Sequence, residues 1–496
     1  MEGQIGASQA PHKKGRRVME RRAYDVIVIG AGTTGENVAD RVVQGGLRAV
    51  IVESELVGGE CSYWACMPSK ALLRPLGALA AARRVAGSRE ACVGKLDAAA
   101  ILARRDSFAS HWKDSGQVKW LRNANIELVR GHGRLSGERQ VTVVSKDGAM
   151  LELSAQHAVA ICTGSRASIP DIPGLRGARP WTSREGVSAK NAPRRLAILG
   201  GGPVACEMAT PWAQLGSSEV TIIQRASRLL PNFEAFVGEA VAKSFAKRGV
   251  KILTETSTQR VERRPDNTIR LTFDSGASLE ADEVLVATGR APNTDDIGLE
   301  VLGLKPGSWL NVDNTMRVEG VTSGFLYAAG DVNHRNLLTH MGKYQARACG
   351  DAIASRALGK LDESEPPPWS RFAATADDNA VPQVIFTDPE IAFVGLTEEC
   401  AKSRGVKVRV VDYEIGRVAG AILHADDYEG RARMIVDLEC NVIVGMTLVG
   451  PGVGELIHAA TIAVVGAVPI DRLWHAVPAY PTISEIWLRL LETLGR

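Results

Sequence analysis

Residues 24–53 read YDVIVIGAGTTGENVADRVVQGGLRAVIVE, and they decide the fold. A β-branched run predicts a first strand, and the residues after the turn predict a helix. The turn between them holds Gly30, Gly32 and Gly35. Glycines let the turn close and let the backbone approach a pyrophosphate at the helix N-terminus. A second predicted strand ends in Glu53, which is placed to bind a ribose, so the segment predicts a dinucleotide-binding βαβ unit.

A pair of cysteines follows in residues 58–70, GGECSYWACMPSK. Cys61 and Cys66 are five positions apart, and Pro68 favours a helix start, so Cys66 is expected near a helix N-terminus that stabilises its thiolate. The same spacing suits a structural pair or half of a zinc site, but no second Cys/His pair at metal-ligand spacing is present in the sequence. We therefore interpret the pair as a redox disulfide and predict no metal site.

A second βαβ unit begins at residues 194–200, RRLAILG. Its turn holds Gly200, Gly202 and, in the third glycine position, Ala205. Its second strand ends in Gln224 instead of an acid, and Arg225 and Arg228 follow. Without a carboxylate there is less to repel a 2′-phosphate, and two guanidinium groups are available to bind it. This pattern predicts NADPH in preference to NADH, with ordinary solvated loop charges as the alternative for the two arginines.

The composition excludes several classes of partner. The chain holds 59 Lys and Arg against 56 Asp and Glu, and residues 1–22 are predicted to be a disordered basic tail, with a transit peptide as the alternative. The remainder is nearly neutral, so nucleic acid is not expected as a partner. The longest apolar runs are too short to cross a bilayer, so no membrane association is expected. Eight mostly isolated cysteines argue against a secreted disulfide framework and favour the cytoplasm.

Taken together, the motifs resemble those of the class I flavoprotein (pyridine nucleotide) disulfide oxidoreductases, the family that includes dihydrolipoamide dehydrogenase and mercuric reductase. The resemblance covers nearly all of residues 23–490. It implies that the first unit binds FAD, that Cys66 contacts the flavin and that Cys61 exchanges with the substrate. It further implies that Lys70 lies by the flavin and pairs with Glu207.

Three further stretches resemble landmarks of the same family. They read AICTGS at 160–165, ATGRAPN at 287–293 and LYAAGD at 326–331, and they bracket the second unit. By resemblance, the cofactor-binding positions in these stretches are Thr163, Gly164, Gly289, Gly330 and Asp331. Without the resemblance, the last of these is only an acid at the end of a strand.

The expected fold is α/β, with two Rossmann-like nucleotide-binding domains and a C-terminal α+β dimerisation domain. The FAD-binding domain is expected to comprise residues 23–165 and 290–362, and the NAD(P)-binding domain residues 166–289. A proline-rich linker precedes the dimerisation domain at residues 375–496. The resemblance therefore implies a homodimer.

The C-terminal domain departs from the family at Tyr480. Relatives carry a His-Pro-Thr-x-x-Glu segment whose His serves as acid and base across the dimer, whereas this chain has Tyr480 and Glu485 at its two ends. A phenol with an ordinary pKa of about 10 is a poor base at neutral pH. Tyr480 thus favours mercuric reductase-like chemistry, although the terminal vicinal cysteines usual in mercuric reductases are missing. His475 is either a substitute base or a hydrogen-bonded residue near the interface.

The function predicted from these features is a FAD-dependent NAD(P)H oxidoreductase. It passes electrons through a Cys61/Cys66 disulfide to a small-molecule acceptor, in the manner of dihydrolipoamide dehydrogenase or mercuric reductase. Two alternatives remain: a reductase of quinones or other non-disulfide acceptors, and a catalytically idle FAD-binding redox sensor.

Overall fold

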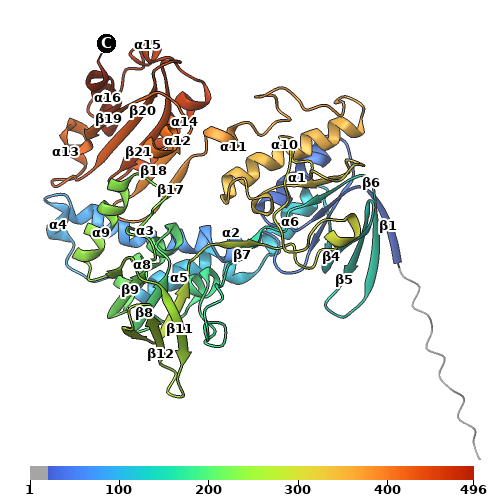
Figure 1. Cartoon of the computed structure of the whole chain (residues 1–496), viewed down its shortest axis with the longest axis horizontal. Coiled ribbons are helices and arrows are strands. Elements are labelled where there is room, and N and C mark those ends of the chain that lie inside the picture. The colour runs from blue at the N-terminus through green and yellow to red at the C-terminus, as the bar shows by residue number, and fades with distance from the viewer. Residues whose placement is uncertain (1–19, 496) are drawn as a thin grey trace, which may run out of the picture.

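The computed structural model describes residues 20–495, and Figure 1 shows three bodies built on separate sheets. In that view the first body lies at the right and the second at the bottom, while the third, at the upper left, contains the C-terminus. The chain passes from the first body to the second and returns to the first before it enters the third.

The first body is a layered α/β unit. Its sheet has the order β3-β2-β1-β6-β5-β4, with β16 paired to β6, and β1 runs parallel to β2 and β6. Because crossover helices cover such a sheet, its central strands are apolar on both faces. Its strands are β1 (Glu20–Ile29), β2 (Ala49–Glu53), β3 (Glu127–Arg130), β4 (His132–Gly137), β5 (Gln140–Val144), β6 (Met150–Ile161) and β16 (Leu326–Ala328). Its main helices are α1 (Thr33–Gln44), α6 (Ser115–Asn123) and α10 (Thr339–Ala357).

The first strand begins earlier than the sequence predicted. β1 starts at Glu20, so residues 20–22 belong to this strand and not to the tail expected to end at residue 22. They pair with β6, and Arg21 forms an ion pair of 2.7 Å with Glu152 on that strand. Residues 1–19 of the expected tail lie outside the described residues.

The second body contains a four-stranded parallel sheet in the order β10-β9-β8-β14 and a three-stranded antiparallel sheet, β11-β12-β13. The parallel strands are β8 (Arg195–Leu199), β9 (Glu219–Ile223), β10 (Lys251–Leu253) and β14 (Glu283–Val286). The antiparallel strands are β11 (Thr258–Arg263), β12 (Ile269–Phe273) and β13 (Ser278–Ala281). The helices are α7 (Ser183–Ser188), α8 (Pro203–Leu215) and α9 (Ala235–Lys247).

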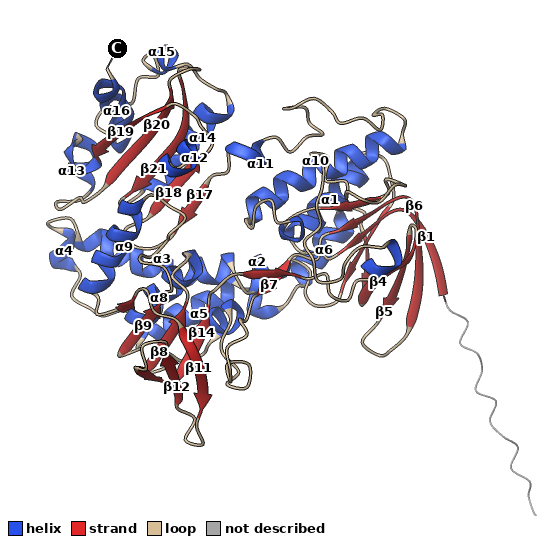
Figure 2. Ribbon diagram, viewed as in Figure 1, coloured by secondary structure: helices blue, strands red, loops and turns tan. Residues whose placement is uncertain are grey.

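Two short strands join the first and second bodies. β7 (Ser165–Ala167) leads out of the first body, β15 (Arg290–Pro292) leads back, and they pair antiparallel between the two bodies (Figure 2). The helices that follow β2 are α2 (Gly59–Tyr63), α3 (Cys66–Arg83), α4 (Ser88–Ala91), α5 (Ala98–Phe108) and the 3-10 helix η1 (Ser110–Trp112). α3 packs on both α5 and α8, so the helix that starts at Cys66 contacts the second body.

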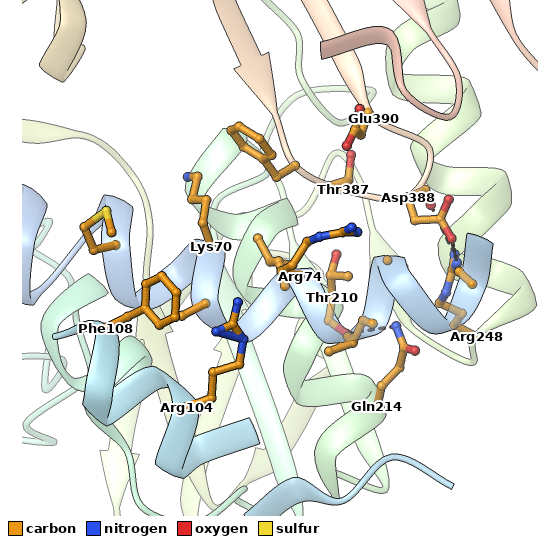
Figure 3. A pocket seen from close by; sticks show the side chains of 17 residues that line it. Lys70, Arg74, Arg104, Phe108, Thr210, Gln214, Arg248, Thr387, Asp388 and Glu390 are labelled. Carbon is orange, nitrogen blue, oxygen red and sulfur yellow. Dashed lines mark hydrogen bonds and ion pairs between the residues drawn. The ribbon is translucent and has the colours of Figure 1, made fainter. Parts of the chain in front are cut away.

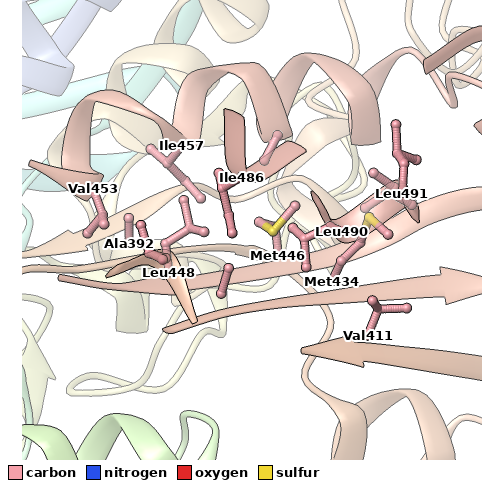
Figure 4. Packing of buried hydrophobic residues seen from close by; sticks show 14 of the residues in the cluster. Ala392, Val411, Met434, Met446, Leu448, Val453, Ile457, Ile486, Leu490 and Leu491 are labelled. Carbon is pink, nitrogen blue, oxygen red and sulfur yellow. The ribbon is translucent and has the colours of Figure 1, made fainter. Parts of the chain in front are cut away.

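The third body is a five-stranded antiparallel sheet, β17-β18-β21-β20-β19, covered by helices (Figure 2). Figure 4 shows its core, where Met434 and Met446 on the sheet pack against Ile457 and Leu490 on the helices. The strands are β17 (Gln383–Ile385), β18 (Ile391–Gly395), β19 (Val408–Glu414), β20 (Arg431–Asp437) and β21 (Val442–Val449). The helices are α11 (Ala376–Asn379), α12 (Glu398–Ser403), α13 (Ala419–His424), α14 (Ile457–Val465), α15 (Ile470–Leu473) and α16 (Ile486–Leu494).

Short 3-10 helices complete the chain between residues 20 and 495. They are η2 (Leu299–Leu302), η3 (Asp331–Asn333), η4 (Ile415–Arg417), η5 (Val453–Glu455) and η6 (Ile483–Glu485). Within that range, no helix has both the length and the apolar character needed to cross a membrane.

Candidate active site

The two cysteines lie at the break between α2 and α3. Cys61 is in α2, Cys66 is the first residue of α3, and both thiols are free and partly buried. The Cys61 thiol donates a hydrogen bond to Cys66, and the Cys66 sulfur lies 3.2 Å from the hydroxyl of Thr339 on α10. The hydrogen bond from Cys61, helped by Thr339 and by the nearby Lys70 charge, lowers the pKa of Cys66 to about 6. The same hydrogen bond and burial raise the pKa of Cys61.

One carboxylate joins all three bodies beside this pair. The ammonium group of Lys70 on α3 lies 2.7 Å from Oε2 of Glu207 on α8, which is the pairing implied by the family resemblance. Oε1 of the same carboxylate accepts a 3.1 Å hydrogen bond from the backbone N–H of Phe386 in the third body. The Lys70 ammonium also lies 5.0 Å from the centre of the Phe386 ring. Because Glu207 is buried and each of its carboxylate oxygens accepts a hydrogen bond, it holds Lys70 next to Cys66.

On the Cys61 side, the structure brings together two charged residues that sequence reasoning missed. Lys343, one turn into α10, lowers the pKa values of both Cys61 and Glu36, so it lies close enough to act on both. Glu36 is on the first turn of α1, and its Oε1 is buried without a hydrogen-bond partner among residues 20–495. Burial raises the pKa of Glu36 to about 7, and the neighbouring Glu53 acts in the same direction.

The glycines in the turn of the first body have two roles: some pack against the backbone, and one faces open space. A Cβ added at Gly30 would lie 2.5 Å from the carbonyl oxygen of Cys162, and one at Gly35 would lie 1.9 Å from that of Gly30. A Cβ at Gly32, by contrast, would have no atom within 4 Å. Gly30 and Gly35 therefore let the turn close on the sheet, while Gly32 faces the space in front of the α1 N-terminus.

Glu53 ends β2 at the far side of this turn. Its two carboxylate oxygens accept hydrogen bonds of 2.7 Å from the N–H groups of Ala31 and Glu55. Burial raises its pKa, while these two hydrogen bonds act in the opposite direction. Glu53 thus ties the glycine turn to the end of β2, a role beyond the ribose contact that the sequence predicted.

The remaining positions expected to bind FAD surround the same space. In the described part of the chain, the Thr163 hydroxyl is buried without a hydrogen-bond partner, and a Cβ at the neighbouring Gly164 would meet nothing within 4 Å. A Cβ at Gly330 would meet the Thr34 side chain at 2.7 Å, so this glycine packs on α1. Asp331 accepts a 2.5 Å hydrogen bond from Ser165, which in turn accepts one of 2.8 Å from Arg290. An unpartnered hydroxyl beside open glycines fits a polar ligand such as a dinucleotide.

The glycine turn of the second body repeats this division. A Cβ at Gly200 would lie 2.4 Å from the carbonyl oxygen of Ala287, whereas Cβ atoms at Gly202 and Gly289 would meet nothing within 4 Å. Ala205 takes the third glycine position, where its methyl group is fully buried in the core around α8. The open space at the α8 N-terminus therefore suits a second dinucleotide.

The two arginines beyond β9 have different roles in the structure. β9 ends at Ile223, and the side chain of the next residue, Gln224, accepts a hydrogen bond from the N–H of Arg225. The guanidinium of Arg228 donates to the carbonyl oxygens of Pro231 and Phe233 at 2.8 and 3.0 Å, so Arg228 braces its own loop. The Arg225 side chain is exposed. Of the two residues predicted to bind a 2′-phosphate, only Arg225 presents a guanidinium that is not committed to the loop.

Comparison with known proteins gives the family. Residues 24–347 match the family model described as pyridine nucleotide-disulphide oxidoreductase, and residues 381–490 match that of its dimerisation domain. The chain belongs to this family. The predicted family, α/β fold and flavin-dependent disulfide oxidoreductase function are thereby confirmed, and FAD and a pyridine nucleotide are the cofactors of the family.

Its relatives in the pyridine nucleotide-disulphide oxidoreductase family include enzymes of two activities. A mercuric reductase of Staphylococcus aureus is 29% identical over 93% of this chain and 81% of its own length. A dihydrolipoyl dehydrogenase of Thermus scotoductus is 32% identical over 96% of this chain and 98% of its own length. Among solved structures, the flavoprotein disulfide reductase RclA of Escherichia coli, as a Cu(II) complex, has a TM-score of 0.81 at 24% identity and covers 96% of this chain and 100% of its own. That likeness shows the fold alone.

The C-terminal residues expected at a disulfide oxidoreductase site lie apart from the cysteines within one chain. Tyr480 is 76% exposed, and no hydrogen bond between described residues joins it to Cys61 or Cys66. Glu485 is buried and accepts a 3.0 Å hydrogen bond from the N–H of Gly420. His475 is exposed. The structure of a single chain thus assigns none of the three to the redox pair.

Other histidines and metal ligands near the site add little. His340 on α10 bonds to the carbonyl oxygen of Pro382 at 2.7 Å, while its neighbour Thr339 is the residue that contacts Cys66. Thr339 carries no motif, so sequence reasoning had no signal for it. In the part of the chain that the structure describes, no group of three or more His, Cys, Asp or Glu side chains is arranged to hold a metal ion.

Proposed function

We propose that this flavoenzyme is a homodimer that uses NADPH to reduce a small disulfide through Cys61. The observation that carries the proposal is the junction at the start of α3. There the Cys66 thiolate is stabilised by Cys61, Thr339 and Lys70, and Glu207 fixes Lys70 between the first and second bodies. A thiolate of lowered pKa held between two dinucleotide turns suits two-electron transfer from one nucleotide site to a disulfide.

The two glycine turns have different ligands in this proposal. The residues that would hold FAD on the first turn are Gly32, Glu53, Thr163, Gly164 and Asp331. Bound there, FAD would supply two-electron transfer between the nicotinamide and the Cys61/Cys66 disulfide. The residues that would hold NADPH on the second turn are Gly200, Gly202, Ala205 and Gly289, where Arg225 would bind the 2′-phosphate and Arg228 supports the loop. The FAD-binding domain is residues 23–165 and 290–362, extended at its start to Glu20 by β1, and the NAD(P)-binding domain is residues 166–289.

The exchange with the acceptor takes place at Cys61. In the reduced pair, the Cys61 sulfur attacks one sulfur of the acceptor disulfide, and the thiol proton of Cys61 passes to the other sulfur, which leaves as the first thiol. The Cys66 thiolate then attacks the Cys61 sulfur, which restores the Cys61/Cys66 disulfide and releases the second sulfur as a thiolate that takes a proton from solvent. Lys343 stabilises the negative charge on Cys61 when its proton leaves. Glu36 is an ionisable carboxyl group beside that lysine, and its pKa is raised to about 7.

The dimer forms through the third body, residues 375–496. Large apolar side chains are exposed along its surface on helices and on the segment before Pro481; they are Ile422, Leu423, Ile462, Val477 and Tyr480. An exposed group of this kind is typical of a protein interface. In the dimer, Tyr480 of one chain faces the redox pair of the other, and Glu485 fixes the segment that carries it through its hydrogen bond to Gly420. We place the enzyme in the cytoplasm, where NADPH and reducing conditions coincide.

Tyr480 supports a second candidate activity. A phenol at this position is a poor base for thiol–disulfide exchange but suits an acceptor whose reduction needs no proton from the protein, such as a thiolate-bound metal ion. The mercuric reductases among the relatives make Hg(II) the metal to test first.

One kinetic comparison separates the candidates. Initial rates of NADPH oxidation by the FAD-loaded protein would be measured with oxidised lipoamide and with thiol-complexed Hg(II) as parallel acceptors, and with NADH in place of NADPH. Rapid turnover with lipoamide supports the disulfide reductase. Turnover with Hg(II) alone supports the second candidate, and no NADPH oxidation with either acceptor contradicts both.

The assignment of Cys66 has its own test. In a Cys61→Ser variant, the alkylation rate of Cys66 by iodoacetamide is measured against pH, because only the thiolate reacts. We expect Lys70→Met in that background to move the midpoint to higher pH, since the lysine charge stabilises the thiolate. An unmoved midpoint would remove Lys70 from this role.

A further inference from the structure

A cavity of about 310 Å³ lies behind the redox helix, away from both glycine turns (Figure 3). Its walls are α3, the end of α5, α8 and residues 386–390 of the third body. It begins at Met67, the residue after Cys66, and shares Lys70 with the redox site. Its volume is at the lower end of the range found for small-molecule sites, which is about 300–1,000 Å³.

Of the two acids at the edge of this cavity, only Asp388 is ion-paired among the described residues. Asp388 forms ion pairs with both Arg84 and Arg248. The remaining acid, Glu390, accepts a 3.3 Å hydrogen bond from the N–H of Gly454, and burial raises its pKa. Glu390 is therefore the one lining acid without an ion pair among the described residues, and the Arg74 charge acts on it.

Two arginines face the cavity without a carboxylate in contact. Arg104 on α5 has no ion pair among residues 20–495, and its guanidinium lies 4.2 Å from the centre of the Phe108 ring. Arg74, one turn after Lys70 on α3, has no ion pair within that range either, and its charge acts on Glu390 from a distance. Figure 3 shows both guanidinium groups among the lining side chains, with Thr210 and Gln214 of α8 nearby.

The rest of the wall is apolar. Leu73 and Leu76 of α3 line it together with three partly exposed side chains, Met67, Phe108 and Phe386. Flat aromatic groups pack well on such surfaces, and a guanidinium stacked on a ring is a rigid donor for a carboxylate. Apolar walls with two arginines that form no ion pair among the described residues favour a ligand that carries both an aromatic ring and an acid group over a wholly polar anion.

We propose that this cavity binds a small aromatic carboxylate, with its ring system between Phe108 and Phe386 and its acid group on Arg104 and Arg74. The site is separate from both glycine turns and from Cys61, so the proposal does not depend on the identity of the electron acceptor. A ligand in this cavity would lie against Met67 and Lys70, beside the start of α3 at Cys66.

Isothermal titration calorimetry of the FAD-loaded protein with 2-naphthoate tests the proposal directly. We expect saturable binding that weakens about tenfold in Arg104→Gln and in Arg74→Gln, because each variant loses a charge-assisted hydrogen bond. Arg122→Gln on α6, an exposed arginine outside the cavity, is the matched control and should bind as the unchanged protein does. The neutral analogue 2-naphthamide should bind about tenfold more weakly than 2-naphthoate.

Competition and a conservative variant complete the test. Arg104→Lys keeps the charge and should restore part of the affinity lost in Arg104→Gln, which separates ligand binding from a folding defect. Saturating NADP⁺ should leave the affinity unchanged. Displacement of 2-naphthoate by NADP⁺ would overturn the proposal. Equal affinities in Arg104→Gln, Arg74→Gln and Arg122→Gln, or no measurable binding, would overturn it as well.

Discussion

The two glycine turns share one packing device and differ in the residues around it. In each turn the first glycine packs against a neighbouring carbonyl, and the glycine at the helix N-terminus faces open space. The third position differs: a Cβ at Gly35 would lie 1.9 Å from a carbonyl oxygen, whereas the second turn holds the methyl group of Ala205 in its core. At this third position, the first turn therefore tolerates an added methyl group less well than the second turn does.

The polar surroundings of the two turns differ more strongly. Glu36 and Glu53 stand around the first turn, while the matching positions of the second turn are the buried thiol of Cys206 and the amide of Gln224. The first turn thus carries carboxylates where the second carries none. In the proposed assignment of FAD to the first turn and NADPH to the second, this contrast would let one fold repeated in one chain select two different dinucleotides.

Gly35→Ala should have the largest effect of any change in this comparison. The added methyl group collides with the Gly30 carbonyl, and we expect a loss of more than about 3 kcal/mol of stability in the first body and purification without FAD. Flavin absorbance per protein measures the outcome. In the control, Gly32→Ala, the added methyl group meets no atom of residues 20–495 within 4 Å, so this variant should leave the fold intact and weaken only FAD binding. Normal FAD content in Gly35→Ala would contradict the packing argument.

Glu36→Gln should have the next largest effect, and it depends on pH. Burial raises the pKa of Glu36 from 4.5 to about 7, so the folded protein binds more protons than the unfolded chain between these values. Stability therefore falls as pH rises from about 4.5 to about 7, although Lys343 opposes part of this effect. Glu36→Gln removes the ionisation and should stabilise the protein by up to roughly 3 kcal/mol at pH 8 and little at pH 4.5.

Thermal unfolding midpoints at the two pH values measure this difference. Asp40→Asn, on the same helix, removes a carboxylate that bonds to Gln44 at the surface and serves as the control. The same midpoint gain in both variants, or a gain in Glu36→Gln that is equal at both pH values, would show that the ionisation of Glu36 is not the cause.

Local motifs predicted most of the fold and only part of the candidate site. Strand, turn and helix follow one another within about 30 residues in each βαβ unit, so the alternation of β-branched runs and glycines in residues 24–53 was sufficient. The Lys70–Glu207 pair joins residues 137 positions apart, and it was predicted only because the family resemblance supplied it. Thr339 lies 273 positions from Cys66 and belongs to no motif, so only the folded chain could reveal its contact.

The burial of side chains and the hydrogen bonds that they form within the chain could not be predicted from the sequence. Glu36 stands inside the recognised glycine motif, yet its buried, unpartnered oxygen depends on how α10 packs on α1. The two arginines after β9 look equivalent in sequence, but Arg228 folds back on the carbonyls of its own loop and Arg225 does not. Similarly, the exposure of Tyr480 follows from a surface that a single chain leaves open.

Substitutions in the loop after β9 should have smaller effects than Gly35→Ala and Glu36→Gln. They should alter the preference between NADPH and NADH. Arg225→Ala should raise the KM for NADPH about tenfold and leave that for NADH nearly unchanged, because only NADPH carries the 2′-phosphate. Gln224→Glu should add repulsion of that phosphate. Arg228→Ala, in contrast, should weaken both nucleotides by loosening the loop at Pro231 and Phe233. Equal effects of Arg225→Ala on both nucleotides would remove the phosphate contact from Arg225.

Ala205→Gly should have the smallest effect, although it alters the same position of the turn as Gly35→Ala. The change removes one buried methyl group and places glycine near the start of α8, which together cost about 1–2 kcal/mol. The turn already accommodates the methyl group, so its removal should leave the KM for NADPH within about twofold. Steady-state kinetics and thermal unfolding measure the two quantities. A large loss of NADPH affinity in Ala205→Gly would mean that the methyl group orders the turn itself, and the two turns would then differ in mechanism as well as in tolerance.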